Sequence, residues 1–160
     1  MIPIITYTDS YKTAVGQLII NIQQNEFNVP ITLEDQPDLA IIPQFYQQKN
    51  GQFWLAVSDQ TLVGTIALID IDHHAGVIRK MFVSADFRGK EIGVAQHLLD
   101  TLVKHSRSVG IQNLYLGTIP RLQAAIRFYE RNGFVHVAKE SLPATFPFMA
   151  VDTVFMQLAL

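Results

Sequence analysis

Residues 77–109 read VIRKMFVSADFRGKEIGVAQHLLDTLVKHSRSV, and the order of residue types in this stretch predicts three successive elements. Val77–Val83 is short and largely apolar, as expected of a buried strand. Ile92–Val109 carries apolar residues at helical spacing, and Gly110 is positioned to end that helix. The turn between them, Arg88–Gly93, holds two glycines and two basic residues. The stretch therefore predicts a strand that leads through a glycine-containing turn into a long amphipathic helix.

The turn Arg88–Gly93 has features that suit phosphate binding. A helix N-terminus presents free backbone N–H groups, and the helix dipole adds partial positive charge there. Gly89 permits a positive φ and close backbone approach, and Gly93, expected in the first helical turn, leaves room for a ligand. Arg88 and Lys90 can add charge pairing. The spacing matches neither the P-loop nor the dinucleotide-binding fingerprint, so these residues alone favour a structural turn as much as an anion site.

The rest of the chain completes an α/β pattern of the order β-α-α-β-β-β-α-β-α-β-β. It predicts one domain over residues 1–160, a sandwich with a mixed, mostly antiparallel sheet of about seven strands flanked by about four helices. A cap at Asp9 or Ser10 is expected to start the first helix, which runs to Ile22. The other expected elements are strands at Ile2–Tyr7, Phe53–Val57, Leu62–Ile69, Asn113–Gly117, Phe134–Ala138 and Val151–Leu158, and helices at Leu39–Gln48 and Leu122–Asn132.

Composition narrows the class of protein. The 160 residues are 49% hydrophobic and 16% charged, which suits one compact domain with a sizeable core. There is no cysteine, so disulfides, cysteine-ligated zinc and a cysteine nucleophile are excluded. The first ten residues lack a basic segment before an apolar run, and no apolar run is long enough for a bilayer. We therefore expect a cytoplasmic protein with no membrane partner.

Charge is distributed unevenly along the chain. Residues 1–78 hold two basic and eight acidic side chains, whereas residues 79–131 hold nine basic and four acidic ones. A basic segment in a mildly acidic protein indicates a bound polyanion, although solvated helix faces explain it as well. Nucleic acid is not the expected partner, because the aromatic residues fall in apolar strands rather than among the basic side chains.

Two strings in this region resemble conserved motifs of the GNAT acetyltransferase superfamily. RKMFVSADFRGKEIGVAQHLLDTLV resembles motif A, and LYLGT followed by AAIRFYERNGF resembles motif B. The resemblance implies the family's fold and acetyl-coenzyme A as co-substrate. Glu91 stands where the consensus has a glycine, and we expect its side chain to point outward from an early helix position. The resemblance implies that the pantetheine arm is lined by Met81, Phe82 and Val83, and that the pyrophosphate loop is Arg88, Gly89, Lys90, Glu91, Ile92 and Gly93.

The resemblance also implies that Tyr129 protonates the departing thiolate. Phenol and thiol have comparable pKa values, roughly 10 and 8.5, so this transfer is not strongly uphill. Tyr129 shares a helical stripe with Leu122 and Ile126, and a plain core role stays open. Many relatives carry a glutamate near Ile78, which this chain lacks. A base acting through water is the preferred account, and the side-chain candidates are Asp70, Asp72, His73, His74 and Glu140.

These features predict an acetyl-coenzyme A-dependent N-acetyltransferase that moves the acetyl group directly to a primary amine of a small molecule or peptide. A non-catalytic acyl-coenzyme A-binding regulatory module is the alternative, favoured by Glu91 and the missing glutamate. No metal site is expected, because the His73-His74 pair has no third ligand. Dimers are common among relatives, so a homodimer is a further expectation. The acceptor is expected near Phe27, Tyr46, Trp54 and the Phe146-Pro147-Phe148 loop.

Overall fold

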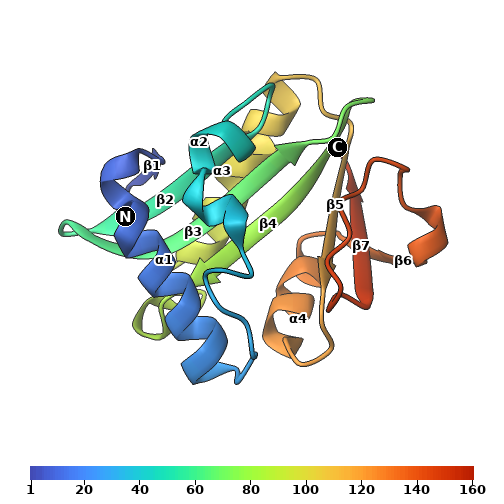
Figure 1. Cartoon of the computed structure of the whole chain (residues 1–160). Coiled ribbons are helices and arrows are strands. Elements are labelled where there is room, and N and C mark those ends of the chain that lie inside the picture. The colour runs from blue at the N-terminus through green and yellow to red at the C-terminus, as the bar shows by residue number, and fades with distance from the viewer.

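A single mixed sheet of seven strands, in the order β1-β2-β3-β4-β5-β7-β6, forms the centre of the molecule (Figure 1). The computed structural model describes all 160 residues. All strand pairs are antiparallel except β4 with β5. The strands are β1 Ile4–Thr6, β2 Gln52–Ser58, β3 Thr61–Asp70, β4 Ala75–Val83, β5 Asn113–Thr118, β6 Val135–Val137 and β7 Val154–Ala159.

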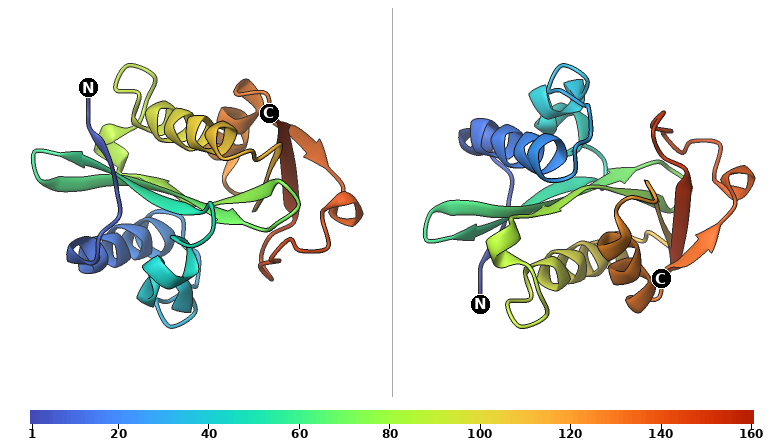
Figure 2. Two further views of the ribbon diagram at one scale, coloured as in Figure 1. Left: turned by 90° about the horizontal axis from the view of Figure 1, so that it is seen from above. Right: turned by 90° about the horizontal axis from the view of Figure 1, so that it is seen from below.

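Four α-helices cover both faces of the sheet, as expected. Figure 2 shows α1 and α2 on one face and α3 and α4 on the other. A π-helical stretch, Asn21–Glu26, continues α1 without a break. No helix combines the length and apolar character needed to cross a bilayer. The helices are α1 Lys12–Ile20, α2 Ile42–Phe45, α3 Val94–Ser108 and α4 Gln123–Arg131.

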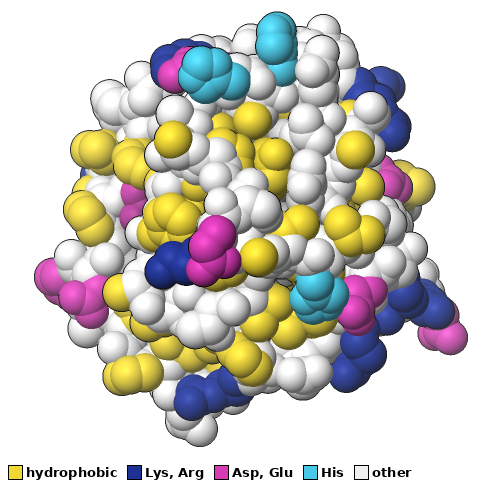
Figure 3. All heavy atoms as spheres, turned by 90° about the vertical axis from the view of Figure 1, so that its right-hand side faces the viewer, with side chains coloured by type: hydrophobic (Ala, Val, Ile, Leu, Met, Phe, Trp, Pro, Cys, Tyr) yellow, Lys and Arg dark blue, Asp and Glu magenta, His cyan; other side chains and the backbone are white.

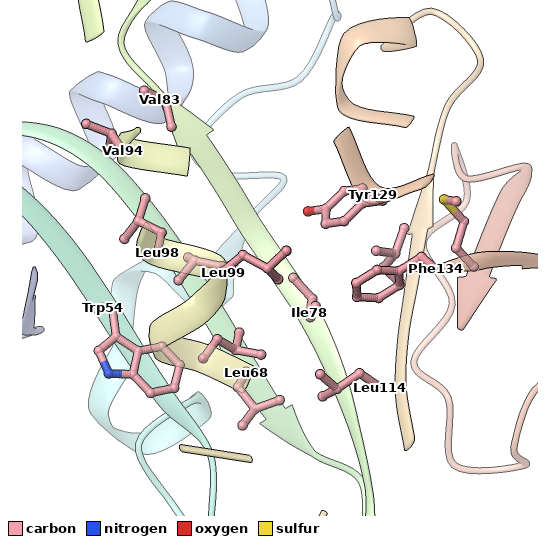
Figure 4. Close-up of a cluster of buried hydrophobic side chains, with 14 of the residues drawn as sticks. Trp54, Leu68, Ile78, Val83, Val94, Leu98, Leu99, Leu114, Tyr129 and Phe134 are labelled. Atoms are coloured by element: carbon pink, nitrogen blue, oxygen red, sulfur yellow. The ribbon is translucent and has the colours of Figure 1, made fainter. Parts of the chain in front are cut away.

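The sheet has a hydrophobic core on each face because its central strands carry apolar residues on both sides. Side chains alternate between the two faces of a strand, so Phe53 and Leu55 contact the α1 side while Trp54 packs against the α3 side. Figure 4 shows the second of these cores, in which Trp54, Leu98 and Leu114 come from β2, α3 and β5. These two cores hold α1 and α3 against opposite faces of the same strands.

The parallel pair β4–β5 separates shortly after it begins. Only Ala75, Gly76 and Val77 of β4 pair with β5, while all six residues of β5 pair with β7. Beyond Val77 the two strands diverge towards α4 (Figure 1). The edge of β4 from residue 78 to residue 83 therefore has no strand partner on that side.

A β-bulge lies in this unpaired part of β4. Thr65 of β3 pairs with Phe82 and Ala67 pairs with Arg79, so two residues of β4 oppose Ile66 alone. Lys80, one of the two, has a φ of 54°, and its carbonyl accepts a 2.6 Å hydrogen bond from the Thr65 hydroxyl. A bulge bends its strand and turns nearby side chains in new directions. This one redirects β4 next to the opening between β4 and β5.

Three local predictions need correction. Neither Asp9 nor Ser10 caps α1, because Asp9 accepts a hydrogen bond from Tyr7 and the Ser10 hydroxyl lies 2.9 Å from that of Thr8. The helix expected over Leu39–Gln48 is a 3-10 turn at Pro37–Ala40 followed by the four residues of α2. The third helix begins at Val94 rather than Ile92. The predicted end of the third helix at Gly110 is confirmed, and Gly110 has a positive φ, as does Gly133 after α4.

The face over β6, β7 and residues 139–152 displays hydrophobic side chains interspersed with charged ones (Figure 3). Val135, Phe148 and Val151 are among the exposed large hydrophobic residues of the chain. The ring of Phe148 packs edge to face on those of the buried Phe146 and Phe155, which also pack edge to face on each other. This aromatic group attaches the loop before β7 to the sheet.

Candidate functional site

A cavity of about 500 Å³ opens where β4 and β5 diverge. Its walls are mostly apolar, and they come from segments far apart in the sequence: the end of α1, β4, β5, α4 and the loop before β7. This size and lining are typical of small-molecule sites. The residues that line the cavity include Phe27, Arg79, Lys80, Met81, Phe82, Val83, Arg88, Gly117, Tyr129 and Asp152.

The turn Arg88–Gly93 presents unpaired backbone donors next to this cavity. Arg88 at its start and Ala95 just after it line the cavity, whereas residues 89–93 do not. The Gly93 N–H donates to Gly89 O at 3.0 Å, which closes the turn just before α3. No acceptor within the chain lies against the backbone N–H groups of Gly89, Lys90, Glu91, Ile92, Val94, Ala95 and Gln96. The arrangement can bind an anion, because a helix N-terminus concentrates such donors and partial positive charge.

Two expectations about this turn were wrong in detail. Gly93 is the N-cap of α3 rather than a residue of its first turn, and its φ of 74° is left-handed. A Cβ there would meet nothing closer than 3.8 Å, so backbone conformation and not space requires glycine. Glu91 precedes the helix instead of lying within it, and its side chain is exposed.

Arg88 is already paired within the protein. Its guanidinium contacts both carboxylate oxygens of Glu26, with Nη2 donating to Oε1 at 2.8 Å, and lies over the ring of Phe27. Its Nε donates to the Val83 carbonyl at 2.8 Å. Lys90 is exposed and forms no ion pair. Of the two cations predicted to meet a phosphate, only Lys90 is therefore free.

Tyr129 lies in the core and at the cavity at once. Its ring is only 5% exposed and packs edge to face against Phe134. Its hydroxyl makes no hydrogen bond, yet no fully enclosed side-chain oxygen lacks a partner, so the hydroxyl reaches the cavity. Figure 4 shows it pointing from α4 towards β4. Burial raises the pKa of Tyr129 above its usual value, so the phenol keeps its proton at neutral pH.

A buried polar cluster that no local sequence pattern predicts anchors the bulge of β4. Tyr46 donates a 2.5 Å hydrogen bond to Asp38 Oδ2, and Lys80 Nζ lies 3.6 Å from the same oxygen. Lys80 also donates to Gln36 Oε1 at 2.5 Å. Burial lowers the pKa of Lys80, and the Asp38 carboxylate opposes that change. The cluster joins α2, the preceding 3-10 turn and the bulge.

Arg79 and Asp152 add two charged groups to the cavity wall. Arg79 Nη2 donates to the Pro147 carbonyl at 2.6 Å, which attaches β4 to the loop before β7. Burial raises the pKa of the Asp152 carboxyl, while Arg79 and Lys80 oppose the rise. Asp152 was missed because a single aspartate before a terminal strand resembles any loop residue.

None of the side chains considered as a base lies at the cavity. Asp72 pairs with Lys49 at 2.9 Å in the turn between β3 and β4, and Asp70 accepts from the backbone of that same turn. His73 and His74 are exposed there, as is Glu140 after β6. The turn lies at the end of β4 that pairs with β5, away from the bulge and the opening.

The expected acceptor residues divide into two groups. Phe27, Phe146 and Pro147 line the cavity. Trp54 does not, because it faces α3 and packs against the ring of His105. Tyr46 is fully buried beneath α2. The alternation of side chains along β2 explains the error for Trp54, since neighbouring positions of one strand face opposite sides of the sheet.

Comparison with known proteins agrees with this geometry. The model of the acetyltransferase (GNAT) family matches residues 17–134. A crystal structure of a GNAT-family acetyltransferase from Staphylococcus aureus Mu50 superposes with a TM-score of 0.95 at 39% identity, covering 99% of both chains. The PaiA N-acetyltransferase of Thermoplasma acidophilum, solved in complex with coenzyme A, has the same fold, with a TM-score of 0.76 at 15% identity over 100% of this chain and 99% of its own.

A curated relative covers the same region. The probable N-acetyltransferase family 8 member 5 of Mus musculus is 32% identical over 111 residues, which are 66% of this chain and 48% of that protein. The chain thus spans about half the length of this relative. The family model covers well over half of the chain, and the solved GNAT-family structure covers nearly all of it. The chain therefore belongs to the acetyltransferase (GNAT) family, for which acetyl-coenzyme A is the co-substrate.

Proposed function

We propose that the cavity binds acetyl-coenzyme A and that the protein transfers the acetyl group directly to a primary amine of a small molecule or peptide. One observation carries the proposal: the N-terminus of α3, where the unpaired N–H of Ala95 lies, and the Tyr129 hydroxyl belong to the same apolar cavity, which Arg88 of the preceding turn also lines. Membership of the acetyltransferase family supports acetyl transfer. The N-acetyltransferase names of the relatives support an amine acceptor.

The turn Arg88–Gly93 suits the pyrophosphate group. Its free donors, the N-terminus of α3 and the charge of Lys90 together favour a doubly charged anion. The Glu91 carboxylate is exposed, so it can remain in solvent while its N–H faces the ligand. Arg88 would join them once a phosphate competes with Glu26 for its guanidinium.

The open edge of β4 suits the pantetheine arm. Met81, Phe82 and Val83 border the cavity, and β5 leaves this edge of the strand unpaired. An extended chain that carries amide groups can pair with such an edge as an additional strand does. The apolar walls then cover the carbon skeleton of the arm and exclude water from the thioester.

Tyr129 suits the role of general acid. The bound thioester supplies an electrophilic carbonyl carbon and a thiolate leaving group. The Tyr129 hydroxyl carries a proton and makes no hydrogen bond within the protein. It points towards β4, where the pantetheine arm is proposed to lie. Burial raises the pKa of Tyr129, and the same apolar surroundings make a thiolate more basic, so proton transfer between them stays feasible.

Phe27, Phe146 and Pro147, which were expected near the acceptor, line the cavity, and their apolar side chains favour an amine with an apolar portion. A non-catalytic regulatory module would have the same coenzyme site, but it would need no Tyr129 hydroxyl free of hydrogen bonds. A cytoplasmic location and a homodimer stay predictions from the sequence.

Incubation with acetyl-coenzyme A and a panel of amines, while free thiol is followed, tests the proposal. We expect thiol release that depends on the amine, together with coenzyme binding measurable by calorimetry. Coenzyme binding without turnover on any amine would favour the regulatory module. An absence of coenzyme binding would contradict both functions.

A further inference from the structure

Asp152 is a carboxylate without a partner on the wall of the cavity. Its backbone N–H donates to Met149 O at 3.1 Å, and the next N–H, of Thr153, donates to Thr118 O of β5 at 3.0 Å. Its side chain makes no hydrogen bond and no ion pair, and its oxygens retain surface in the cavity. The main chain of Asp152 is thus fixed on β5 while its carboxylate stays available.

Gly117 allows this carboxylate to lie against β5. A Cβ at Gly117 would lie 2.7 Å from Oδ2 of Asp152, closer than side-chain carbons are found. Gly117 also lines the cavity, and its φ is not in the left-handed region. The absence of a side chain at Gly117 therefore makes room for the Asp152 carboxylate, and the backbone conformation does not require glycine there.

The cations near Asp152 have other hydrogen-bond or ion-pair partners. Arg79 and Lys80 of β4 are the cations that act on the carboxyl. Arg79 donates to Pro147, and Lys80 is held by Asp38 and Gln36. β5 adds no ionisable side chain to the cavity, and α4 adds the phenol of Tyr129. Arg121, between β5 and α4, also lines the cavity, and its guanidinium donates to the carbonyls of Phe27 and Asn28.

We propose that Asp152 is the general base that receives the ammonium group of the acceptor and removes its proton. This inference rests on the proposed function and names the residue that the acetyl transfer still lacks. Asp152 and Tyr129 line the same cavity. The part of β4 that runs from the bulge to Val83 lines it as well. A carboxylate and a phenol then act on opposite sides of one transfer, the first on the amine and the second on the thiol.

The proton transfers balance. One N–H bond of the ammonium breaks, an O–H bond forms on Asp152, and the nitrogen keeps the electron pair as a neutral amine. The nitrogen forms a bond to the acetyl carbonyl carbon while the bond from carbon to sulfur breaks, and Tyr129 gives its proton to the sulfur. The second proton that the nitrogen loses restores Tyr129, and Asp152 releases the first proton to solvent.

The position of Asp152 predicts a specific pH profile for Asp152→Asn. We expect kcat/KM for the amine to fall by about 10²-fold or more at neutral pH, the usual contribution of a general base. The loss should shrink as the pH rises, because the acceptor then deprotonates in solution. Coenzyme affinity by calorimetry should not change. Asp72→Asn, which removes an exposed carboxylate outside the cavity, is the matched control and should keep the wild-type profile.

Gly117→Ala tests the same role without removing the carboxylate. The new methyl group should displace Oδ2 of Asp152, so turnover should fall while coenzyme affinity is kept. Adding Asp152→Asn to Gly117→Ala should cause little further loss, because both changes remove one function. Additive losses would contradict the proposal.

Two results separate the possible failures. An active wild type whose Asp152→Asn variant is within threefold of it, or loses the same factor at every pH, overturns the role of Asp152 alone. A wild type that transfers acetyl to no amine overturns the proposed function and this inference with it.

Asp152→Asn should not reduce thermal stability at neutral pH, since burial raises the pKa of that carboxyl and the ionised form therefore costs stability.

Discussion

Arg88 and Glu26 form an ion pair that joins the end of the π-helical stretch to the proposed pyrophosphate turn. Nη2 of Arg88 donates to Oε1 of Glu26 at 2.8 Å, and Nη1 contacts the second carboxylate oxygen. The pair is partly exposed, with 37% and 32% of the two side chains accessible. The pair joins Arg88, which was predicted to bind phosphate, to a carboxylate from the opposite layer of the fold. The carboxylate would compete directly with a bound phosphate.

Glu26→Gln should therefore strengthen coenzyme binding. Exposed ion pairs contribute at most about 1 kcal/mol, so the gain in affinity should not exceed about fivefold. The gain should shrink at high ionic strength, because salt screens the charges involved. Calorimetry at two salt concentrations measures both effects, and Glu34→Gln, an exposed acidic residue without an ion pair, is the control. Weaker binding in Glu26→Gln would show instead that the pair holds the turn in its binding conformation.

Gly89→Ala should weaken coenzyme binding through the backbone alone. Gly89 has a φ of 108°, and a Cβ there would meet no atom within 4 Å. Alanine is strained at such a φ by roughly 1–2 kcal/mol, and the turn should relax away from its donor geometry. Gly110→Ala is the matched control, because Gly110 has a φ of 83° and equally open surroundings at the far end of α3.

Both glycine variants should lose similar thermal stability, and only Gly89→Ala should lose affinity for acetyl-coenzyme A. Thermal unfolding and calorimetry on the same samples separate the two effects. An equal affinity in both variants would mean that residues 88–93 form a structural turn.

Tyr129→Phe should lower turnover while leaving both coenzyme affinity and stability nearly unchanged. The hydroxyl has no partner in the protein, so its removal leaves no orphaned polar group. A lost general acid costs typically 10²–10⁴-fold in rate, and we expect about 10²-fold in kcat. Steady-state kinetics with denaturant unfolding checks this prediction. Equal losses of affinity and turnover would assign Tyr129 a packing role only.

Tyr46→Phe should destabilise the fold at the anchor of the β4 bulge. It removes the 2.5 Å hydrogen bond to the buried Asp38 carboxylate, and hydrogen bonds to charged groups are worth about 1.5–3 kcal/mol. We expect the free energy of unfolding in urea to fall by about 2 kcal/mol with an unchanged slope. Tyr7→Phe is the comparison, because Tyr7 donates to the exposed Asp9 at 3.1 Å and should cost less. The reverse order would contradict the assignment of Tyr46 to the anchor of the bulge.

Alkaline pH should unfold the protein through its buried tyrosines. Burial, with Asp9 adding to the effect, raises the pKa of Tyr7 to about 12, and burial raises the pKa of Tyr46 and Tyr129 as well. A raised pKa in the folded state means that the unfolded chain releases its protons first. The contribution of these tyrosines to stability should therefore be constant below pH ~10 and fall as the pH rises towards 12, where the folded phenol of Tyr7 ionises. Thermal unfolding across this range, with tyrosinate absorbance as the probe, measures the fall.

Short-range pattern was enough for most of the fold. Short apolar runs joined by turn residues predict β2 and β3, and helical spacing between a glycine turn and Gly110 predicts α3. These elements are predictable because each depends on neighbours within a few residues. The starts of helices were less accurate, since the side chains of Asp9 and Ser10 bond to other residues in preference to capping α1.

The residues of the proposed coenzyme site were foreseeable for a similar reason, because a strand, a turn and a helix N-terminus are contiguous in sequence. The state of each residue was not foreseeable. Arg88 is paired with Glu26, Lys80 is buried in a bulge, and Asp152 lies beside Gly117, and each of these contacts joins segments distant along the chain.

The chain's local pattern thus specified which elements form and where a turn with free backbone donors precedes a helix, because helix, strand and turn propensities act over a few neighbouring residues. Long-range packing alone established the cavity and its charges, because β4 and β5 separate only after Val77, and that separation depends on β7, α4 and the bulge together.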